Sequence, residues 1–219
     1  MSTMNLDRVR VLTHSSIRIQ TAAGTVVYFD PYNMRDAAHD ADIICITHAH
    51  YDHFSPKDIA RAARQDTQLV VPASMAGEAP QAGLAAIHTM QPGDSLRLAD
   101  VELDAVPAYN VQPERLGFHP KSNAWLGYVL AADDMRYYVA GDTDQNPDNM
   151  QIPCDVTLVP IGGTFTMDPA QAAAFVNVLQ PRAAIPTHYG SVAGKPEDAE
   201  AFAALVDPSI QVAIKTEQL

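Results

Sequence analysis

Residues 47–53 read THAHYDH, which places three of the chain's eight histidines and one aspartate within seven positions. The apolar run DIICI at 42–46 comes directly before them. Burying so many polar groups at the end of an apolar strand is unfavourable unless a positive charge pairs with them. The stretch therefore predicts a metal site.

The spacing within the motif indicates more than one ion. His48 and His50 are two residues apart, so at the end of a strand they point to the same side. Asp52 and His53 come just before the next predicted helix, for which Ser55 is the expected N-cap, so the chain turns away at these two residues. One short loop can thus present ligands in two directions, which is enough for two neighbouring ions.

Further candidate ligands follow other apolar runs of the sequence. These are Asp30 in VVYFDPY, Asp142 in YYVAGDTD and His188 in AAIPTHYG. Active sites on sheets tend to collect at strand ends, so we expect these side chains to meet. Simpler roles are a turn residue for Asp142 and a core histidine for His188. Asp144 is expected to be a solvated turn residue.

The composition predicts one globular domain spanning residues 1–219, because 47% of the residues are apolar and 18% are charged. The formal net charge of −12 argues against a nucleic-acid partner. No apolar run has the length of a signal segment or of a membrane span. Cys45 and Cys154 lie in apolar surroundings and are expected to be buried, free thiols. Together these features predict a cytoplasmic protein.

Short runs rich in Val, Ile and Tyr, separated by Gly, Pro and Asp, predict many short strands. Helices are predicted at 55–65, 168–181 and 195–206, the first two with a Ser or Asp cap followed by proline. Strands dominate each half and helices follow them, which favours a layered α/β architecture. Residues 107–123 lack periodicity, and a long loop in a compact domain is usually functional.

The motif H-x-H-x-D-H, followed in order by GDTD and PTHYG, resembles the metallo-β-lactamase-fold hydrolase superfamily. The resemblance extends from THSSI and FDPY to the last histidine. Within that superfamily the chain is most similar to compact metal-dependent hydrolases related to L-ascorbate-6-phosphate lactonase and to acylethanolamine-lipid phosphodiesterases. The resemblance implies a four-layer αβ/βα sandwich with the metal site at one edge of the sheets.

The resemblance also implies a set of ligands for two divalent ions. Zinc is the expected metal, although manganese and iron also fit mixed histidine and carboxylate ligands. Asp30 is expected to orient ligand histidines, as such carboxylates usually do. His14 in LTHSS resembles a histidine near the site of relatives, where packing and substrate contact are both open roles. The implied ligands are His48 and His50 for the first metal, Asp52, His53 and His188 for the second, and Asp142 for both.

One ligand of the first metal does not transfer directly. Relatives commonly have a histidine where VPAYN has Asn110, and an amide oxygen is a poorer zinc ligand than imidazole. We predict that His119, nine residues further along, reaches back to the first metal. Asn110 would then be a nearby hydrogen-bonding partner or a substrate contact. The alternative is a first site that lacks this histidine.

Two divalent ions about 3.5–4 Å apart can share a water and lower its pKa. We therefore expect a metal-bridged hydroxide, positioned by Asp52, to hydrolyse an ester, lactone or phosphodiester bond of a small cytoplasmic metabolite. Arg115 and Lys121 are candidate contacts for an anionic substrate, although an ordinary surface role also fits each of them. The alternatives are a metal-binding sensor without turnover and, against the acidic charge, a nuclease.

Overall fold

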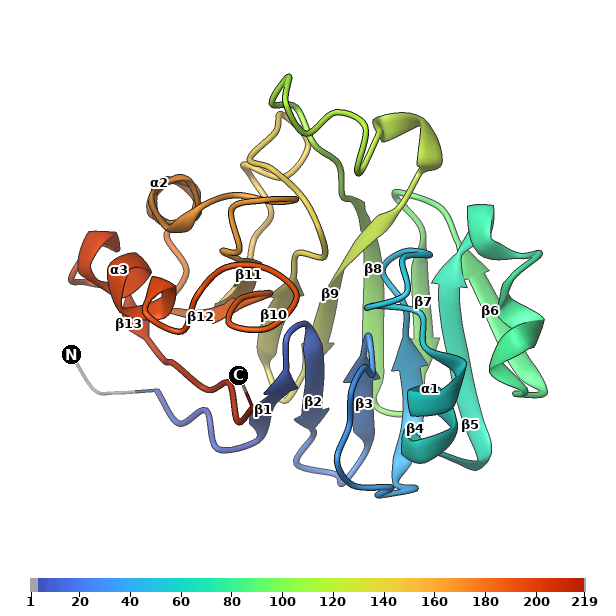
Figure 1. Cartoon of the computed structure of the whole chain (residues 1–219). Helices are drawn as coiled ribbons and strands as arrows, with labels where there is room; N and C mark the ends of the chain where they lie inside the picture. Colours follow the sequence, from blue (N-terminus) through green and yellow to red (C-terminus); the bar gives the residue numbers. More distant parts are fainter. Residues whose placement is uncertain (1–3, 219) are drawn as a thin grey trace.

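The computed structural model describes residues 4–218, whose strands form two sheets that lie face to face (Figure 1). In the first sheet, the three leading strands pair antiparallel and the rest continue in parallel. Spatial order follows sequence order in this sheet. Its strands are β1 (Val9–Thr13), β2 (Ser16–Gln20), β3 (Val26–Phe29), β4 (Ala41–Cys45), β5 (Ala63–Pro72) and β6 (Ala86–Met90).

The second sheet has seven strands in the order β13-β12-β11-β10-β9-β8-β7. The strands from β7 to β10 pair antiparallel, and those from β10 to β13 pair in parallel. Its strands are β7 (Ser95–Leu98), β8 (Val101–Pro107), β9 (Leu126–Ala132), β10 (Met135–Val139), β11 (Val156–Pro160), β12 (Ala183–Thr187) and β13 (Gln211–Val212).

Helices cover the outer faces of both sheets, which confirms the predicted four-layer sandwich (Figure 1). One apolar core lies between the sheets, and a further core lies between each sheet and its helices. Among residues 4–218, no helix is long and apolar enough to span a bilayer. The α-helices are α1 (Pro56–Ala62), α2 (Pro169–Leu179) and α3 (Asp198–Leu205), and the 3-10 helices are η1 (Ala73–Met75), η2 (Ala79–Ala82) and η3 (Lys121–Asn123).

The predicted starts of the first two helices agree with the structure better than their predicted ends, whereas α3 begins at Asp198, three residues later than predicted, without a side-chain cap. Ser55 caps α1, and Asp168 forms a capping box with Gln171 at the start of α2. Helix α1 ends at Ala62, three residues earlier than predicted, because the chain enters β5 at the next residue. Here the strand pairing of β5 overrides a weak local preference for helix.

Both cysteines are free, but only one has the predicted environment. Cys45 is fully buried between the sheets, where Tyr128 is also buried and donates a hydrogen bond to the Ile46 carbonyl at 2.8 Å. Cys154 is half-buried beside the core under α2 and α3. Cys154 is therefore less buried than predicted, because it lies in the segment before β11 rather than within a strand.

Several strands end with an abrupt change of backbone direction. His14, Asp30 and His188 directly follow β1, β3 and β12, and each has a positive φ, of 49°, 45° and 57°. Such a conformation is uncommon for a non-glycine residue and costs of order 1–3 kcal/mol. Gly141, after β10, has φ 65°, and an added Cβ would lie 2.9 Å from the Leu126 carbonyl oxygen. These turns bring side chains from different strands to a common site.

Candidate metal centre

All seven predicted metal ligands gather at one place, together with His14, which was predicted to lie near the site. In three groups, each residue offers one ligand atom, and the atoms of a group all lie within 4.8 Å of one another. The first cluster is His48, His50 and His119; the second cluster is His14, Asp52, His53 and His188; and the joining group is His48, His53 and Asp142.

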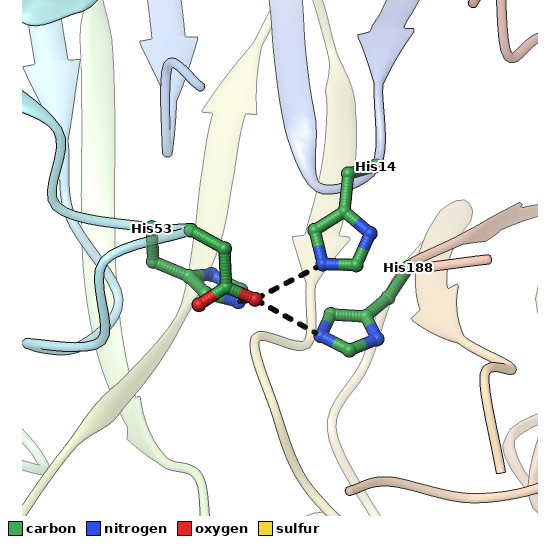
Figure 2. Close-up of side chains that lie close together, drawn as sticks. His14, His53 and His188 are labelled. Carbon is green, nitrogen blue, oxygen red and sulfur yellow. Dashed lines mark hydrogen bonds and ion pairs between the residues drawn. The ribbon is translucent and has the colours of Figure 1, made fainter. Parts of the chain in front are cut away.

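The second cluster is built from strand ends and from the motif loop (Figure 2). Asp52 Oδ2 lies 3.2 Å from His14 Nε2, 3.7 Å from His53 Nε2 and 3.8 Å from His188 Nε2. All four side chains are buried. His14 occupies the two-residue turn between β1 and β2, a position that usually takes Gly, Asn or Asp. The turn thereby places an imidazole against Asp52.

Asp142 lies between the two clusters. Its Oδ2 is 3.2 Å from His119 Nε2 and 3.0 Å from His188 Nε2, while its Oδ1 is 3.4 Å from His53 Nε2. The carboxylate is 3% exposed. It therefore faces histidines of both clusters at once, which is the geometry that a shared ligand requires.

The first cluster brings His119 next to the motif histidines. His48 Nε2 and His50 Nδ1 are 3.1 Å apart, and the His119 ring centroid lies 5.0 Å from each of their ring centroids. Trp125 packs against all three rings, with centroid distances of 4.9, 4.9 and 5.7 Å. Half-buried Trp125 is thus a wall of the site as well as part of the packing.

Asn110 lies beside His119 rather than in its place. Asn110 Oδ1 is 2.8 Å from His119 Nδ1, and the Asn110 amide donates to the His119 carbonyl at 2.8 Å. The side-chain amide of Asn110 also donates to the Phe165 carbonyl at 3.2 Å. The loop is therefore closed on itself, with the imidazole Nε2 turned toward Asp142.

The structure overturns two expectations about this loop. Asp144 is 1% exposed and accepts hydrogen bonds from the amides of Val111 and Gln112 at 2.9 and 3.1 Å, so it is not a solvated turn residue. Arg115 is 4% exposed and pairs with Asp144 at 2.8 Å, so it is not a surface residue. Sequence position alone did not reveal that loop 107–123 folds over Asp144. Lys121, in contrast, is exposed and pairs with Asp148.

Asp30 holds two residues of the motif, Thr47 and His53, through hydrogen bonds. It accepts hydrogen bonds from the Thr47 amide at 2.8 Å and from Thr47 Oγ1 at 2.6 Å. Its Oδ2 lies 2.7 Å from His53 Nδ1, which leaves His53 Nε2 facing Asp142. A carboxylate on the far nitrogen of a ligand histidine fixes its tautomer and orientation.

The pattern of buried polar atoms fits a bound cation. Within residues 4–218, the Nε2 atoms of His53, His119 and His188 and the Oδ1 atom of Asp142 are buried without a hydrogen-bond partner. Buried polar atoms are normally paired, so four such atoms in one place need an explanation. Imidazole nitrogens and a carboxylate oxygen are ligands that zinc accepts.

The protonation states point the same way. Burial lowers the pKa of His48 well below its usual value, with a further contribution from His53. Burial alone would raise the pKa of Asp142, but His188 and His53 hold it well below its usual value. Burial likewise opposes ionisation of Asp52, yet the hydrogen bond to His14 and the charge of His53 lower its pKa to about 2. Ionised carboxylates beside a neutral imidazole are the forms that bind metal.

His53 is the exception among the buried histidines. Burial lowers its pKa, but the neighbouring Asp142 and Asp30 raise it by more, to well above the usual value. The two carboxylates thus favour a positive charge at this position. For His14, burial and then His188 lower the pKa to about 4.

Some residues at the site escaped the sequence analysis. Thr47 Oγ1 lies 3.0 Å from His48 Nδ1. The position of Thr47 directly before His48 in the quoted motif was a sequence signal for this contact. Ser191 Oγ lies 3.3 Å from His14 Nδ1. Tyr51, Phe118 and Phe165 line the approach to the site. No spacing rule connects these aromatic residues, because they come from separate loops.

Known proteins match this chain along most of its length. A family model described as a beta-lactamase superfamily domain matches residues 8–188. A UPF0173 metal-dependent hydrolase of Thermococcus onnurineus is 33% identical over 221 residues, covering 94% of this chain and 95% of the relative. A UPF0173 protein of Pyrococcus abyssi is 32% identical, covering 83% and 82%.

Solved structures share the fold. The crystal structure of a candidate metal-dependent hydrolase from Parabacteroides distasonis aligns with a TM-score of 0.81 at 29% identity, covering 94% of this chain and 91% of the other. The matched span includes the histidine motif, Asp142 and His188. The chain therefore belongs to the beta-lactamase superfamily and, within it, to the UPF0173 family of metal-dependent hydrolases.

Proposed function

We propose that residues 1–219 act as one metal-dependent hydrolase domain that holds two divalent ions and cleaves an ester, lactone or phosphodiester bond of a small molecule. Residues 1–3 and 219 of this domain lie outside the described residues. The observation that carries the proposal is Asp142, whose two oxygens face unpaired histidine nitrogens of both clusters. The metal-dependent hydrolase names of the relatives support it.

In this proposal each cluster holds one ion. His48, His50 and His119 would bind the first, Asp52, His53 and His188 the second, and Asp142 would contribute to both. A pair of divalent ions supplies a nucleophilic hydroxide near neutral pH and stabilises negative charge that develops on a carbonyl or phosphoryl oxygen.

The other residues orient these ligands. Asp30 would fix His53 through Nδ1, and Asn110 would fix His119 in the same way, at contact distances of 2.7 and 2.8 Å. His14 would hold Asp52 through the 3.2 Å contact with Oδ2. Asp52, whose carboxylate lines the cavity over the site, would orient the nucleophile and accept its proton.

The sequence-based predictions of zinc, of a cytoplasmic location, of no nucleic-acid partner and of the lactonase-like branch remain predictions. An anionic substrate also remains one. Arg115 and Lys121 give it little support, because both cations are already paired with carboxylates.

The test is metal analysis combined with a rate measurement. Protein purified without chelators should carry more than one transition-metal equivalent per chain and should hydrolyse phenyl acetate or bis(4-nitrophenyl) phosphate. Chelation should abolish turnover, and zinc or manganese should restore it. A chain that takes up neither metal would contradict the proposal, whereas full metal content without turnover of any substrate would favour the sensor alternative.

A further inference from the structure

A cavity of about 200 Å³ opens directly over the candidate metal centre. His50, Asp52 and Asp142 line its inner side. Because these three residues belong to both clusters and to the joining group, a molecule in the cavity lies against the reacting centre. The chemistry of the remaining walls therefore describes the part of the substrate next to the bond that is cleaved.

The remaining walls are aromatic or aliphatic. They are formed by Tyr51, Phe118, Phe165 and Val192. The rings of Phe118 and Phe165 pack edge to face, with centroids 4.9 Å apart and an interplanar angle of 84°. Tyr51 is 67% exposed and Phe118 is 39% exposed, although large apolar side chains are usually buried. Exposed aromatic residues around a concave site are typical of a ligand surface.

No lysine or arginine of residues 4–218 lines this cavity. The two cations of the nearby loop are directed elsewhere, with Arg115 pairing with Asp144 and Lys121 with Asp148. A charged substrate group against these walls would lose hydration without gaining a partner, which is costly. Each methylene group buried against these walls contributes about 0.8 kcal/mol of binding free energy, which is a factor of about four in affinity.

The volume limits the size of the group. A dry cavity of about 150 Å³ is enough to bind benzene, whereas sites for drug-sized ligands measure roughly 300–1,000 Å³. The cavity of about 200 Å³ thus accommodates one ring or a short chain.

We propose that the wall formed by Tyr51, Phe118, Phe165 and Val192 binds an uncharged aryl or short alkyl group that adjoins the scissile bond, so that the substrates are small apolar esters or lactones. This substrate class rests on the proposed hydrolase function. In this substrate class, apolar contact with the two phenylalanines takes the place of the contact with Arg115 or Lys121 that was expected for an anionic substrate.

A direct test uses binding and turnover separately. With the metal-loaded protein, calorimetry should show that butyrohydroxamic acid binds at least about tenfold more tightly than succinohydroxamic acid, whose tail ends in a carboxylate. In turnover, kcat/KM should rise about fourfold per added methylene from phenyl acetate to phenyl butyrate. Phenyl hydrogen succinate should be the poorest substrate of the series.

Variants of the wall sharpen the test. Phe165→Lys should reverse the preference in favour of the carboxylate tail, while Phe165→Leu should keep the preference for the apolar tail. Val192→Lys provides a second cationic wall if Phe165→Lys does not fold. Circular dichroism and metal content verify that each variant retains the fold and the metal centre.

The possible failures are distinguishable. Equal or tighter binding of the carboxylate tail by the wild type, or binding of neither hydroxamate, would overturn the apolar substrate class. A clear apolar preference in binding without hydrolysis of any ester would support the binding wall and overturn the hydrolase function on which the substrate class rests.

Discussion

The two clusters differ in how the chain holds their side chains. The second cluster draws His14 and His188 from the ends of strands, and its side chains are between 0 and 8% exposed. In the first cluster, His50 is half-buried and His119 belongs to loop 107–123. The sheets thus preorganise one cluster, while a folded loop must complete the other.

This difference predicts unequal metal binding. The second cluster has its donors fixed by strand pairing and by Asp30 before any ion binds. The first cluster depends on contacts that Asn110, Arg115 and Asp144 make within the loop region. We expect tighter binding at the second cluster and partial occupancy at the first. Four variants can break or sharpen the comparison.

Asp142→Asn should have the largest effect, because the residue faces both clusters. An amide keeps the shape but removes the charge, so both ions should be lost and the rate should fall by more than the roughly 100-fold typical for an orienting residue. Elemental analysis and kcat measure this. Asp134→Asn, at an exposed turn, is the control. Retention of both ions in Asp142→Asn would show that the carboxylate is not shared.

His119→Ala should remove one ion and leave the other. The second cluster does not include His119, so about one equivalent should remain while the rate falls about 100-fold or more. His88→Ala, on edge strand β6, is the matched control. Full metal content and full rate in His119→Ala would assign the first metal to other ligands.

Arg115→Met should loosen the loop without touching a candidate ligand. Both side chains of the Arg115–Asp144 pair are almost fully buried, and removing one partner of such a pair typically costs about 3–5 kcal/mol of stability. Denaturant unfolding of the metal-free chain measures this cost. Adding Asp144→Asn should recover part of it.

The exposed Lys121–Asp148 pair provides the comparison for this loss. Because an exposed pair contributes little, Lys121→Met should unfold like the wild type. If Arg115→Met were equally neutral, the loop would be held by its other contacts alone, and the account of the first cluster would need revision.

Asn110→Ala should have the smallest effect of the four. It removes the 2.8 Å contact with His119 Nδ1 but leaves the backbone hydrogen bond between the two residues. Loss of such an orienting contact typically weakens metal binding by at least about tenfold. Titration of the metal-free chain with zinc should show this weakening at one site only. Equal weakening at both sites would argue against separate clusters.

The sequence was informative where function and local structure coincide. The motif at 47–53 has its ligands at fixed spacing, so its residues had to lie together whatever the rest of the chain did. The caps at Ser55 and Asp168 also follow from local hydrogen bonding and appear as predicted. The predicted end of α1 was wrong because the chain after Ala62 pairs with β4, and a contact between residues this far apart in the chain leaves no local sequence signal.

The loop region shows where sequence reasoning stops. Eight residues lie between Asn110 and His119, and their identities do not reveal whether the segment turns back or points outward. Asp144 lacked any local sign of burial, yet it binds two loop amides and Arg115. The walls of the apolar cavity come from four loops, so their meeting is visible only in the folded chain.

The sequence by itself determined the donor types, the strand-end positions of Asp30, Asp142 and His188, and the layered fold, because these depend on local patterns. The tertiary structure decided that Asp142 faces both clusters, that His14 meets Asp52, and that the loop carries His119 inward. The physical reason is that a metal centre needs several donors within a few ångströms of one another. Donors from strands far apart in the chain reach that distance only when the two sheets pack and their ends align.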